Sequence, residues 1–213
     1  MTGAKICGVS TPEAVSAAIE GGAQFLGFNF FPKSPRYVTP ERAAQLAAPA
    51  RGRNIGIVAV TVDPDDDLVD RIVTVLKPDL IQLHGSETPQ RTVEVRTRSD
   101  AGIIKVLPVS GPDDFAAAWG YEPFVEHMLF DARTPKGSDL PGGMGVRFDW
   151  TLLKGRSFPR PYFLAGGLDP WNVAEAIAQS GAPLVDVSSG VERGAGLKDP
   201  TLISAFLAAV ART

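Results

Sequence analysis

Short runs of apolar and β-branched residues alternate along this chain with longer, alanine-rich segments. This alternation is typical of β-strands separated by helices, and it favours parallel strands joined by crossover helices. The eight apolar runs predict strands over residues 3–7, 24–30, 54–61, 79–83, 102–107, 125–131, 160–165 and 183–187. The pattern therefore predicts an α/β fold built on a parallel sheet.

Each predicted strand is followed by a helix whose start is marked in the sequence. In five of the eight starts a Thr or an Asp stands directly before a proline. Its side chain can cap the first turn, and proline at the first helical position loses only an N–H that had no partner. The starts are Thr11, Thr39, Asp63, Ser86, Gly111, Asp149, Asp169 and Asp199. Eight units in 213 residues leave about 27 residues each, which predicts one lean (β/α)8 barrel (TIM barrel) domain over residues 1–213.

Composition narrows the class of protein further. The formal net charge is −3, and the 21 basic and 24 acidic residues are interspersed, which argues against a nucleic-acid partner. A single cysteine cannot form an internal disulfide, and the first residues lack the apolar core of a signal peptide, so we expect a cytoplasmic protein. No apolar stretch approaches the roughly 18 residues that a membrane-spanning helix needs, so we expect no membrane partner.

Two segments near the C-terminal end predict a phosphate site. Gly166 and Gly167 follow the seventh predicted strand, and Ser188 and Ser189 follow the eighth. Paired glycines let the main chain approach an anion closely, and serine hydroxyls with free N–H groups at a helix start can donate hydrogen bonds to it. The loops after strands seven and eight commonly bind phosphate in (β/α)8 barrels.

Two other strand ends carry groups suited to proton transfer. Cys7 ends the first predicted strand and Asp131 ends the sixth. Because all barrel strands open at one mouth, this thiol and this carboxyl could act as proton acceptor and donor on one ligand. A free cysteine is more often a small buried apolar residue than a catalyst, so Cys7 alone does not establish an enzyme.

Long segments follow strands two and six, over 30–38 and 132–147, and the four glycines of the second suit a mobile lid.

A set of motifs occurs in the order found in a known enzyme family. They are Lys5-Ile6-Cys7-Gly8, Phe28-Asn29-Phe30 with Ser34-Pro35-Arg36-Tyr37-Val38, Gln82-Leu83-His84-Gly85, Phe130-Asp131, Gly142-Gly143-Met144-Gly145 with Phe148-Asp149-Trp150, Ala165-Gly166-Gly167-Leu168, and Asp186-Val187-Ser188-Ser189-Gly190-Val191-Glu192. Single motifs are weak signals, but the ordered set covers nearly the whole chain and resembles the phosphoribosylanthranilate isomerases. The resemblance implies an enzyme of tryptophan biosynthesis that needs neither a metal nor an organic cofactor. Its reaction would be the Amadori rearrangement of N-(5-phosphoribosyl)anthranilate to 1-(2-carboxyphenylamino)-1-deoxyribulose 5-phosphate.

The resemblance also implies roles for the catalytic residues. Cys7 would be the general base that removes the proton from C2 of the sugar, and Asp131 the general acid that protonates the ring oxygen. A nearby cation, Lys5 or Arg36, would favour the thiolate form of Cys7. Asp131 must start protonated, which burial or the anionic groups of the ligand would favour.

Binding roles follow from the same resemblance. Arg36 would bind the anthranilate carboxylate through two hydrogen bonds, and His84 and Asp186 would contact the rest of the substrate. The phosphate would be bound by Gly145, Gly166, Gly167, Ser188 and Ser189. Met144 and Pro141 depart from the family pattern, so we expect differences in the lid rather than in the reaction. We expect a structural role for His127 and buried positions for Trp150 and Trp171 between barrel and helices.

Two other functions stay open at this point. One is the sister isomerase of histidine synthesis, which performs the same rearrangement on a bisphosphorylated substrate with two aspartates and two phosphate sites. Cys7 argues against it, as does Gln82-Leu83-His84-Gly85 in place of a second glycine-rich phosphate site. The other is a non-catalytic phosphosugar-binding barrel, which the presence of both Cys7 and Asp131 disfavours. In each case the partner is a small phosphosugar, and we expect a monomer or a homodimer.

Overall fold

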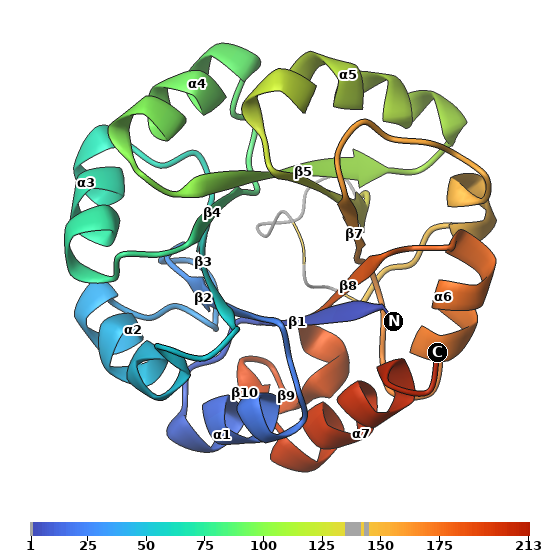
Figure 1. Cartoon of the computed structure of the whole chain (residues 1–213), viewed down its shortest axis with the longest axis horizontal. Coiled ribbons are helices and arrows are strands. Elements are labelled where there is room, and N and C mark those ends of the chain that lie inside the picture. Colours follow the sequence, from blue (N-terminus) through green and yellow to red (C-terminus); the bar gives the residue numbers. More distant parts are fainter. Residues whose placement is uncertain (1, 135–141, 143–144) are drawn as a thin grey trace.

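The strands form a closed barrel. The computed structural model describes residues 2–134, 142 and 145–213. Eight parallel strands pair in chain order, and β8 pairs with β1 to close the ring (Figure 1). They are β1 Gly3–Cys7, β2 Phe25–Asn29, β3 Gly56–Thr61, β4 Leu80–Leu83, β5 Gly102–Val109, β6 His127–Ala132, β7 Tyr162–Leu164 and β8 Leu184–Val187. The predicted (β/α)8 barrel is confirmed, and every strand end lies within two residues of its predicted position.

Helices surround this barrel on the outside (Figure 1). They are α1 Pro12–Glu20, α2 Pro40–Ala47, α3 Asp66–Val75, α4 Pro89–Arg98, α5 Ala118–Tyr121, α6 Val173–Ser180 and α7 Pro200–Val210. Short 3-10 helices occupy Ala48–Ala50, Pro112–Ala117, Glu122–Phe124, Trp150–Leu153 and Ser189–Val191, and a small hairpin of β9 Glu192–Gly194 and β10 Leu197–Lys198 follows β8. The last helix, α7, packs against the first, α1. In the described part of the chain, no helix has the length and apolar character needed to span a bilayer.

Polar caps begin the helices, mostly where the sequence predicts them. Thr11, Thr39 and Asp199 accept hydrogen bonds from the first turns of α1, α2 and α7. Helices α3 and α4 begin two residues later than predicted, because Asp65 and Thr88 supply the capping oxygen. A cap accepts a hydrogen bond from an N–H group that has no partner within the helix. The residue whose side chain accepts this bond therefore determines where the helix begins.

The helical segments after β5, β6 and β7 differ from the prediction. After β5 the chain forms three short helical pieces, and among the described residues after β6 it forms one 3-10 helix, which Asp149 caps as predicted. After β7, Asp169 accepts the N–H groups of Trp171 and Asn172 in a turn, so α6 begins only at Val173. This turn leaves Trp171 80% exposed, so its predicted burial is wrong, whereas Trp150 is buried as predicted.

Side chains alternate between two apolar regions along each strand. On β5, Ile103 packs against the helices and Ile104 fills the barrel interior. Near the N-terminal ends of the strands, the ring of His127 packs against Phe25 and Phe163. Burial lowers the pKa of His127, which favours the neutral ring and agrees with the structural role expected for it.

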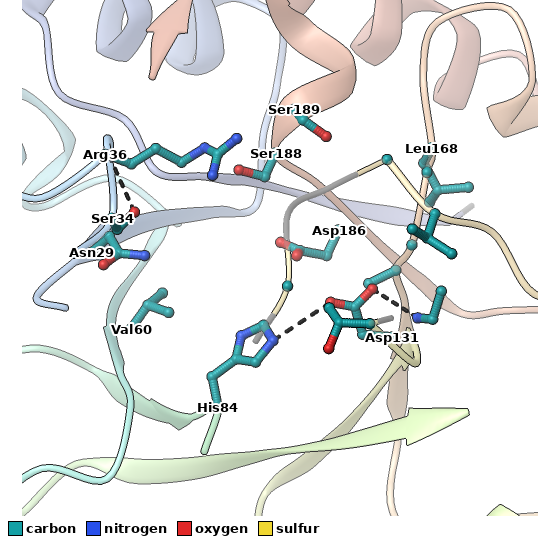
Figure 2. Close-up of a pocket in the computed structure, with 18 of the residues that line it drawn as sticks. Asn29, Ser34, Arg36, Val60, His84, Asp131, Leu168, Asp186, Ser188 and Ser189 are labelled. Atoms are coloured by element: carbon teal, nitrogen blue, oxygen red, sulfur yellow. Dashed lines mark hydrogen bonds and ion pairs between the residues drawn. The ribbon is translucent and has the colours of Figure 1, made fainter. Parts of the chain in front are cut away.

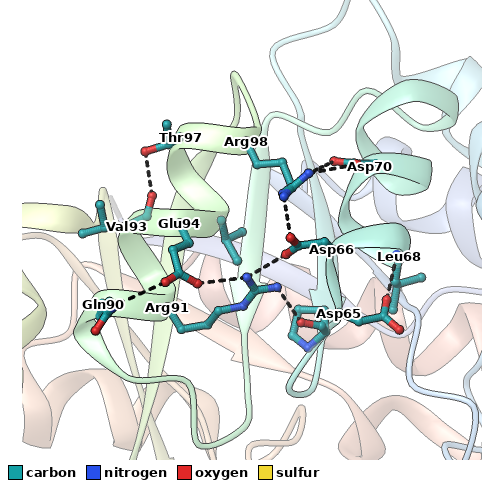
Figure 3. A network of polar contacts seen from close by, with 12 residues as sticks. Asp65, Asp66, Leu68, Asp70, Gln90, Arg91, Val93, Glu94, Thr97 and Arg98 are labelled. Atoms are coloured by element: carbon teal, nitrogen blue, oxygen red, sulfur yellow. Dashed lines mark hydrogen bonds and ion pairs between the residues drawn. The ribbon is translucent and has the colours of Figure 1, made fainter.

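Exposed ion pairs connect α3 with α4 in the outer layer (Figure 3). Arg91 contacts Asp66 at 2.7 Å, and Arg98 contacts both Asp66 and Asp70. The hydrogen bond from Arg91 lowers the pKa of Asp66. Because these groups lie in solvent, salt screens them and their contribution to stability is small.

Candidate active site

A pocket opens at the carboxyl ends of the barrel strands (Figure 2). Nine of the ten predicted site residues line it: Arg36, His84, Asp131, Gly145, Gly166, Gly167, Asp186, Ser188 and Ser189. The tenth, Cys7, is buried at the end of β1, where its carbonyl oxygen accepts a hydrogen bond of 3.2 Å from the Ser188 hydroxyl. A parallel barrel brings all C-terminal strand ends to one side, which is why residues far apart in the chain meet here.

Lys5 and Asp186 form a buried ion pair beside Cys7. Lys5 on β1 lies opposite Asp186 on β8 in the sheet register, and its Nζ is 2.7 Å from Oδ1 of Asp186. Burial alone would lower the pKa of Lys5, but Asp186 and Cys7 together outweigh it and raise that pKa, so Lys5 is a cation. Burial raises the pKa of the Cys7 thiol, and Lys5 and Lys198 act in the opposite direction.

The carboxyl group of Asp131 lies next to the ring of His84 in the pocket. Nδ1 of His84 accepts a hydrogen bond of 3.2 Å from the side-chain amide of Gln82, since an amide nitrogen can only donate. This places the ring proton on Nε2, which is 3.5 Å from Oδ2 of Asp131. The other oxygen of Asp131 accepts the N–H of Ala132 at 2.8 Å. One contact on each carboxylate oxygen therefore holds the Asp131 side chain in the pocket.

The loop after β7 presents its main chain to the pocket. Gly166 and Gly167 adopt φ angles of 87° and 64°, a left-handed conformation that strongly favours glycine. Nε of Arg147 donates to the carbonyl oxygen of Gly167 at 3.0 Å, and its Nη2 is 2.8 Å from Oδ2 of Asp169. Arg147 therefore stabilises this turn. Ser188 and Ser189, the first residue of the following 3-10 helix, line the same pocket (Figure 2).

Arg36 comes from the loop after β2 and is held by a residue for which the sequence suggested no role. Its Nε and Nη2 donate to the two carboxylate oxygens of Glu192 at 2.7 and 2.9 Å. Glu192 also accepts from the buried Lys198 at 2.5 Å, and these two cations lower its pKa against the effect of burial. Lys198 in turn donates to the carbonyl oxygen of Ser188. Glu192 ends one of the motifs, but no local signal marked Lys198.

Part of the predicted lid lies outside the described residues. Residues 135–141 and 143–144, which include Pro141 and Met144, are among those not described. Gly142 is described, and a Cβ atom built on it would lie 2.7 Å from Nε2 of His84 and 2.8 Å from Oδ2 of Asp131. The main chain of Gly142 therefore approaches the His84–Asp131 pair closely.

The fold and the pocket together are typical of a (β/α)8-barrel enzyme, whose active site lies at the carboxyl ends of the strands, and this pocket is lined by a carboxyl group, a histidine, an arginine, glycines and serines. A family model of N-(5'-phosphoribosyl)anthranilate (PRA) isomerase matches residues 4–209. The N-(5'-phosphoribosyl)anthranilate isomerase of Caulobacter vibrioides is 63% identical over 210 residues, which cover 99% of this chain and 96% of that protein. The one from Brucella canis is 50% identical over 207 residues, 97% of this chain and 93% of that protein.

Solved structures agree. Phosphoribosyl anthranilate isomerase from Thermotoga maritima superposes with a TM-score of 0.87 at 33% identity, over the full length of both chains. A phosphoribosyl anthranilate isomerase in complex with reduced 1-(o-carboxyphenylamino)-1-deoxyribulose 5-phosphate has a TM-score of 0.85 at 31% identity, again over both full lengths.

This chain belongs to the N-(5'-phosphoribosyl)anthranilate isomerase family. The predicted family, its barrel fold and its isomerase activity in tryptophan biosynthesis are confirmed. The histidine-pathway isomerase and the non-catalytic barrel are left without support.

Proposed function

We propose that this chain rearranges N-(5-phosphoribosyl)anthranilate by general acid-base catalysis, with Asp131 as the acid and Cys7 as the base. The observation that carries this assignment is the arrangement of the pocket. The carboxyl group of Asp131, the side chain of Arg36, the glycines of the turn after β7 and the serines after β8 line one pocket, and the carbonyl oxygen of the buried Cys7 accepts a hydrogen bond from one of these serines, Ser188. The substrate carries groups that these residues can bind: an aromatic carboxylate, a sugar and a phosphate.

Asp131 is suited to the ring-opening step. Protonated on Oδ2, it would give its proton to the furanose ring oxygen as the C1–O bond breaks, leaving a protonated imine at C1. The carboxyl group does not swing freely, because Ala132 N–H holds Oδ1. His84 Nε2, 3.5 Å from Oδ2, lies where it can donate to the carboxylate that forms.

Cys7 is suited to the second step. Its thiolate would remove the proton from C2, and the resulting enamine would tautomerise to the ketone of the product. Asp186 lines the pocket directly beside this position and would contact the sugar. General acid and base groups of this kind typically contribute about 100- to 10,000-fold to the rate.

The two anionic groups of the substrate would anchor its ends. Main-chain N–H groups of Gly145, Gly166 and Gly167, with the hydroxyls of Ser188 and Ser189, would bind the phosphate. Arg36 would bind the anthranilate carboxylate, with Glu192 fixing the plane of its guanidinium group.

The assignment is tested with freshly generated phosphoribosylanthranilate, whose fluorescence is lost on conversion. A blank without protein corrects for spontaneous decay, and chromatography against authentic product identifies what forms. Cys7→Ser and Asp131→Asn serve as matched inactive controls of nearly unchanged shape. Fluorescence that persists with folded wild-type protein would refute the proposal.

We further propose that the enzyme is a cytoplasmic single-domain protein over residues 1–213, and a monomer or homodimer. Contact between α1 and α7 supports the single domain, because it joins the two ends of the chain. The solved Thermotoga maritima relative includes a dimeric form, which supports the homodimer option. Light scattering across a concentration series would decide between the two states.

A further inference from the structure

Lys5 is a buried charged residue that the acid-base scheme above does not use. Its side chain is fully buried, and it lies two residues before Cys7 on β1, so both side chains face the same side of the strand. That side is the barrel interior, where Cys7 packs with apolar residues such as Val58 and Leu129. An ammonium group in such surroundings is costly, and a methionine would fill a similar volume without the charge. The fold alone therefore gives no reason for a lysine here.

The ammonium group of Lys5 is held at a defined position. Asp186 on the neighbouring strand accepts a hydrogen bond from Nζ at 2.7 Å, and Cys7 is close enough to help raise the pKa of Lys5. On the other side of β1, a Cβ atom built on Gly27 of β2 would lie 3.2 Å from both Cε and Nζ of Lys5. The glycine leaves the space in which the amine sits, and Asp186 keeps it there (Figure 2 shows Asp186 in the pocket).

Three charged groups from three strands act on the Cys7 thiol: Lys5 of β1, Asp186 of β8 and Lys198 of β10. Burial is the largest influence and raises the pKa of the thiol, Lys5 lowers it most among the charges, Asp186 raises it and Lys198 lowers it. Lys198 is engaged with Glu192 and the main chain of Ser188. Lys5 lies on the same face of β1 as Cys7, and the Cβ position of Gly27 is 3.2 Å from both its Nζ and Cα of Cys7, so Lys5 is the cation placed to donate to the sulfur.

We propose that Lys5 is a positioning residue: its ammonium group, held by Asp186, donates a hydrogen bond to Sγ of Cys7 and stabilises the thiolate that acts as base. This inference rests on the proposed role of Cys7. The thiol first loses its proton to solvent. The thiolate then takes the C2 proton of the protonated imine, the C2–H electron pair becomes the C1–C2 double bond of a neutral enamine, and the sulfur is again a thiol. Lys5 keeps its three protons throughout.

The test measures the ionisation of Cys7 without substrate. Cys7 is the only cysteine, so cysteine labelled with carbon-13 at Cβ gives one resonance whose shift with pH reports the pKa of this thiol. Lys5→Met is expected to raise that pKa by about 1–3 units, and Asp186→Asn to lower it, since it frees Lys5 from its counterion. The matched control is Lys105→Met. Lys105 is also buried, and its Nζ is 2.5 Å from Oε2 of Glu87. The Lys105→Met variant is expected to leave the titration of Cys7 unchanged.

Kinetics give the second readout. In Lys5→Met, kcat at neutral pH is expected to fall about tenfold or more, with a small change in KM, and the acidic limb of the pH profile, where activity rises as the thiol ionises, should move to higher pH as far as the NMR titration does. A purely structural lysine would lower the amount of folded protein without moving that limb. An unchanged pKa of Cys7 in folded Lys5→Met would overturn the proposal.

Two further variants keep the test decisive if Lys5→Met does not fold. Asp186→Asn changes the charge beside Lys5, and Gly27→Ala crowds Nζ without removing a charge. If Cys7 titrates in both as in the wild type, the proposal is wrong. If the titration shifts as expected but wild-type protein fails to convert the substrate, the proposed function fails and the Lys5–Cys7 contact is supported.

Discussion

Replacing Gly167 by alanine tests whether the turn after β7 binds the phosphate group. Gly167 has a φ of 64°, where a residue with a Cβ pays roughly 1–2 kcal/mol. The added Cβ would also lie 2.4 Å from Cγ of Arg147, 2.7 Å from the carbonyl oxygen of Gly145 and 3.0 Å from that of Val146. Arg147 can move in part, but the two carbonyls are main chain and line the pocket side of the turn.

The expected loss of stability combines both effects. Backbone strain together with the cost of overpacking predicts a decrease of about 2–5 kcal/mol in the free energy of unfolding. The displaced main chain would also remove the anion site. Wild-type protein should gain about 2.7 kcal/mol from inorganic phosphate at a hundredfold excess over its Kd. For a chain of this length that corresponds to a rise in Tm of about 5–10 °C.

The matched control is Gly181→Ala. Gly181 has a φ of 69°, but a Cβ built there has no neighbour within 4 Å, so this variant pays the strain without the clash. Thermal unfolding is followed for both variants and the wild type across a phosphate titration. Gly181→Ala should start from a lower Tm and keep the phosphate-induced rise, whereas Gly167→Ala should lose it. An equal rise in both variants would show that the anion binds elsewhere.

Further expected outcomes concern chemistry, recognition and pH. Cys7→Ser and Asp131→Asn should fold with unchanged circular dichroism and lose about 100- to 10,000-fold in kcat, and a loss below about tenfold would reduce either residue to packing. Arg36→Ala should weaken binding of anthranilate-containing ligands about ten- to a hundredfold, measured by calorimetry. That difference should nearly vanish for an analogue without the carboxylate, whereas an equal loss on both ligands would mean that Arg36 only supports Glu192 and its loop. Burial lowers the pKa of His127, so its contribution to stability is present above the unfolded value of about 6.5 and is lost as pH falls from there through the lower pKa of the folded protein. His127→Phe should flatten this part of the urea-unfolding profile between neutral pH and about pH 5, and an unchanged slope would assign the acid sensitivity to other groups.

Local signals in the chain were enough for the fold and for most of the pocket. Apolar runs with the length of strands, separated by alanine-rich segments, determine a parallel barrel, because each strand must return to the same end before the next one starts. Once the barrel is known, residues such as Asp131 and Ser188 meet because they stand at strand ends. Gly166 and Gly167 could be recognised because a close main-chain approach needs glycine itself.

Sequence-based predictions were wrong where a local conformation depends on which of several nearby side chains accepts the free main-chain N–H groups. Trp171 follows an Asp-Pro pair that resembles other helix starts, but the Asp169 side chain closes a turn there and leaves the indole in solvent. The same competition moved the starts of α3 and α4 to Asp65 and Thr88.

Pairing between distant charges was decided only by the tertiary structure. Lys5 bonds to a carboxylate 181 residues away, and Arg36 to one 156 residues away. Each partner carries only its charge as a local signal, and the chain offers 24 acidic residues, so the sequence cannot choose among them. The closure of the barrel determines the partner of Lys5, because the register of β1 against β8 places Lys5 opposite Asp186. Burial then favours pairing with the one carboxylate within hydrogen-bonding distance.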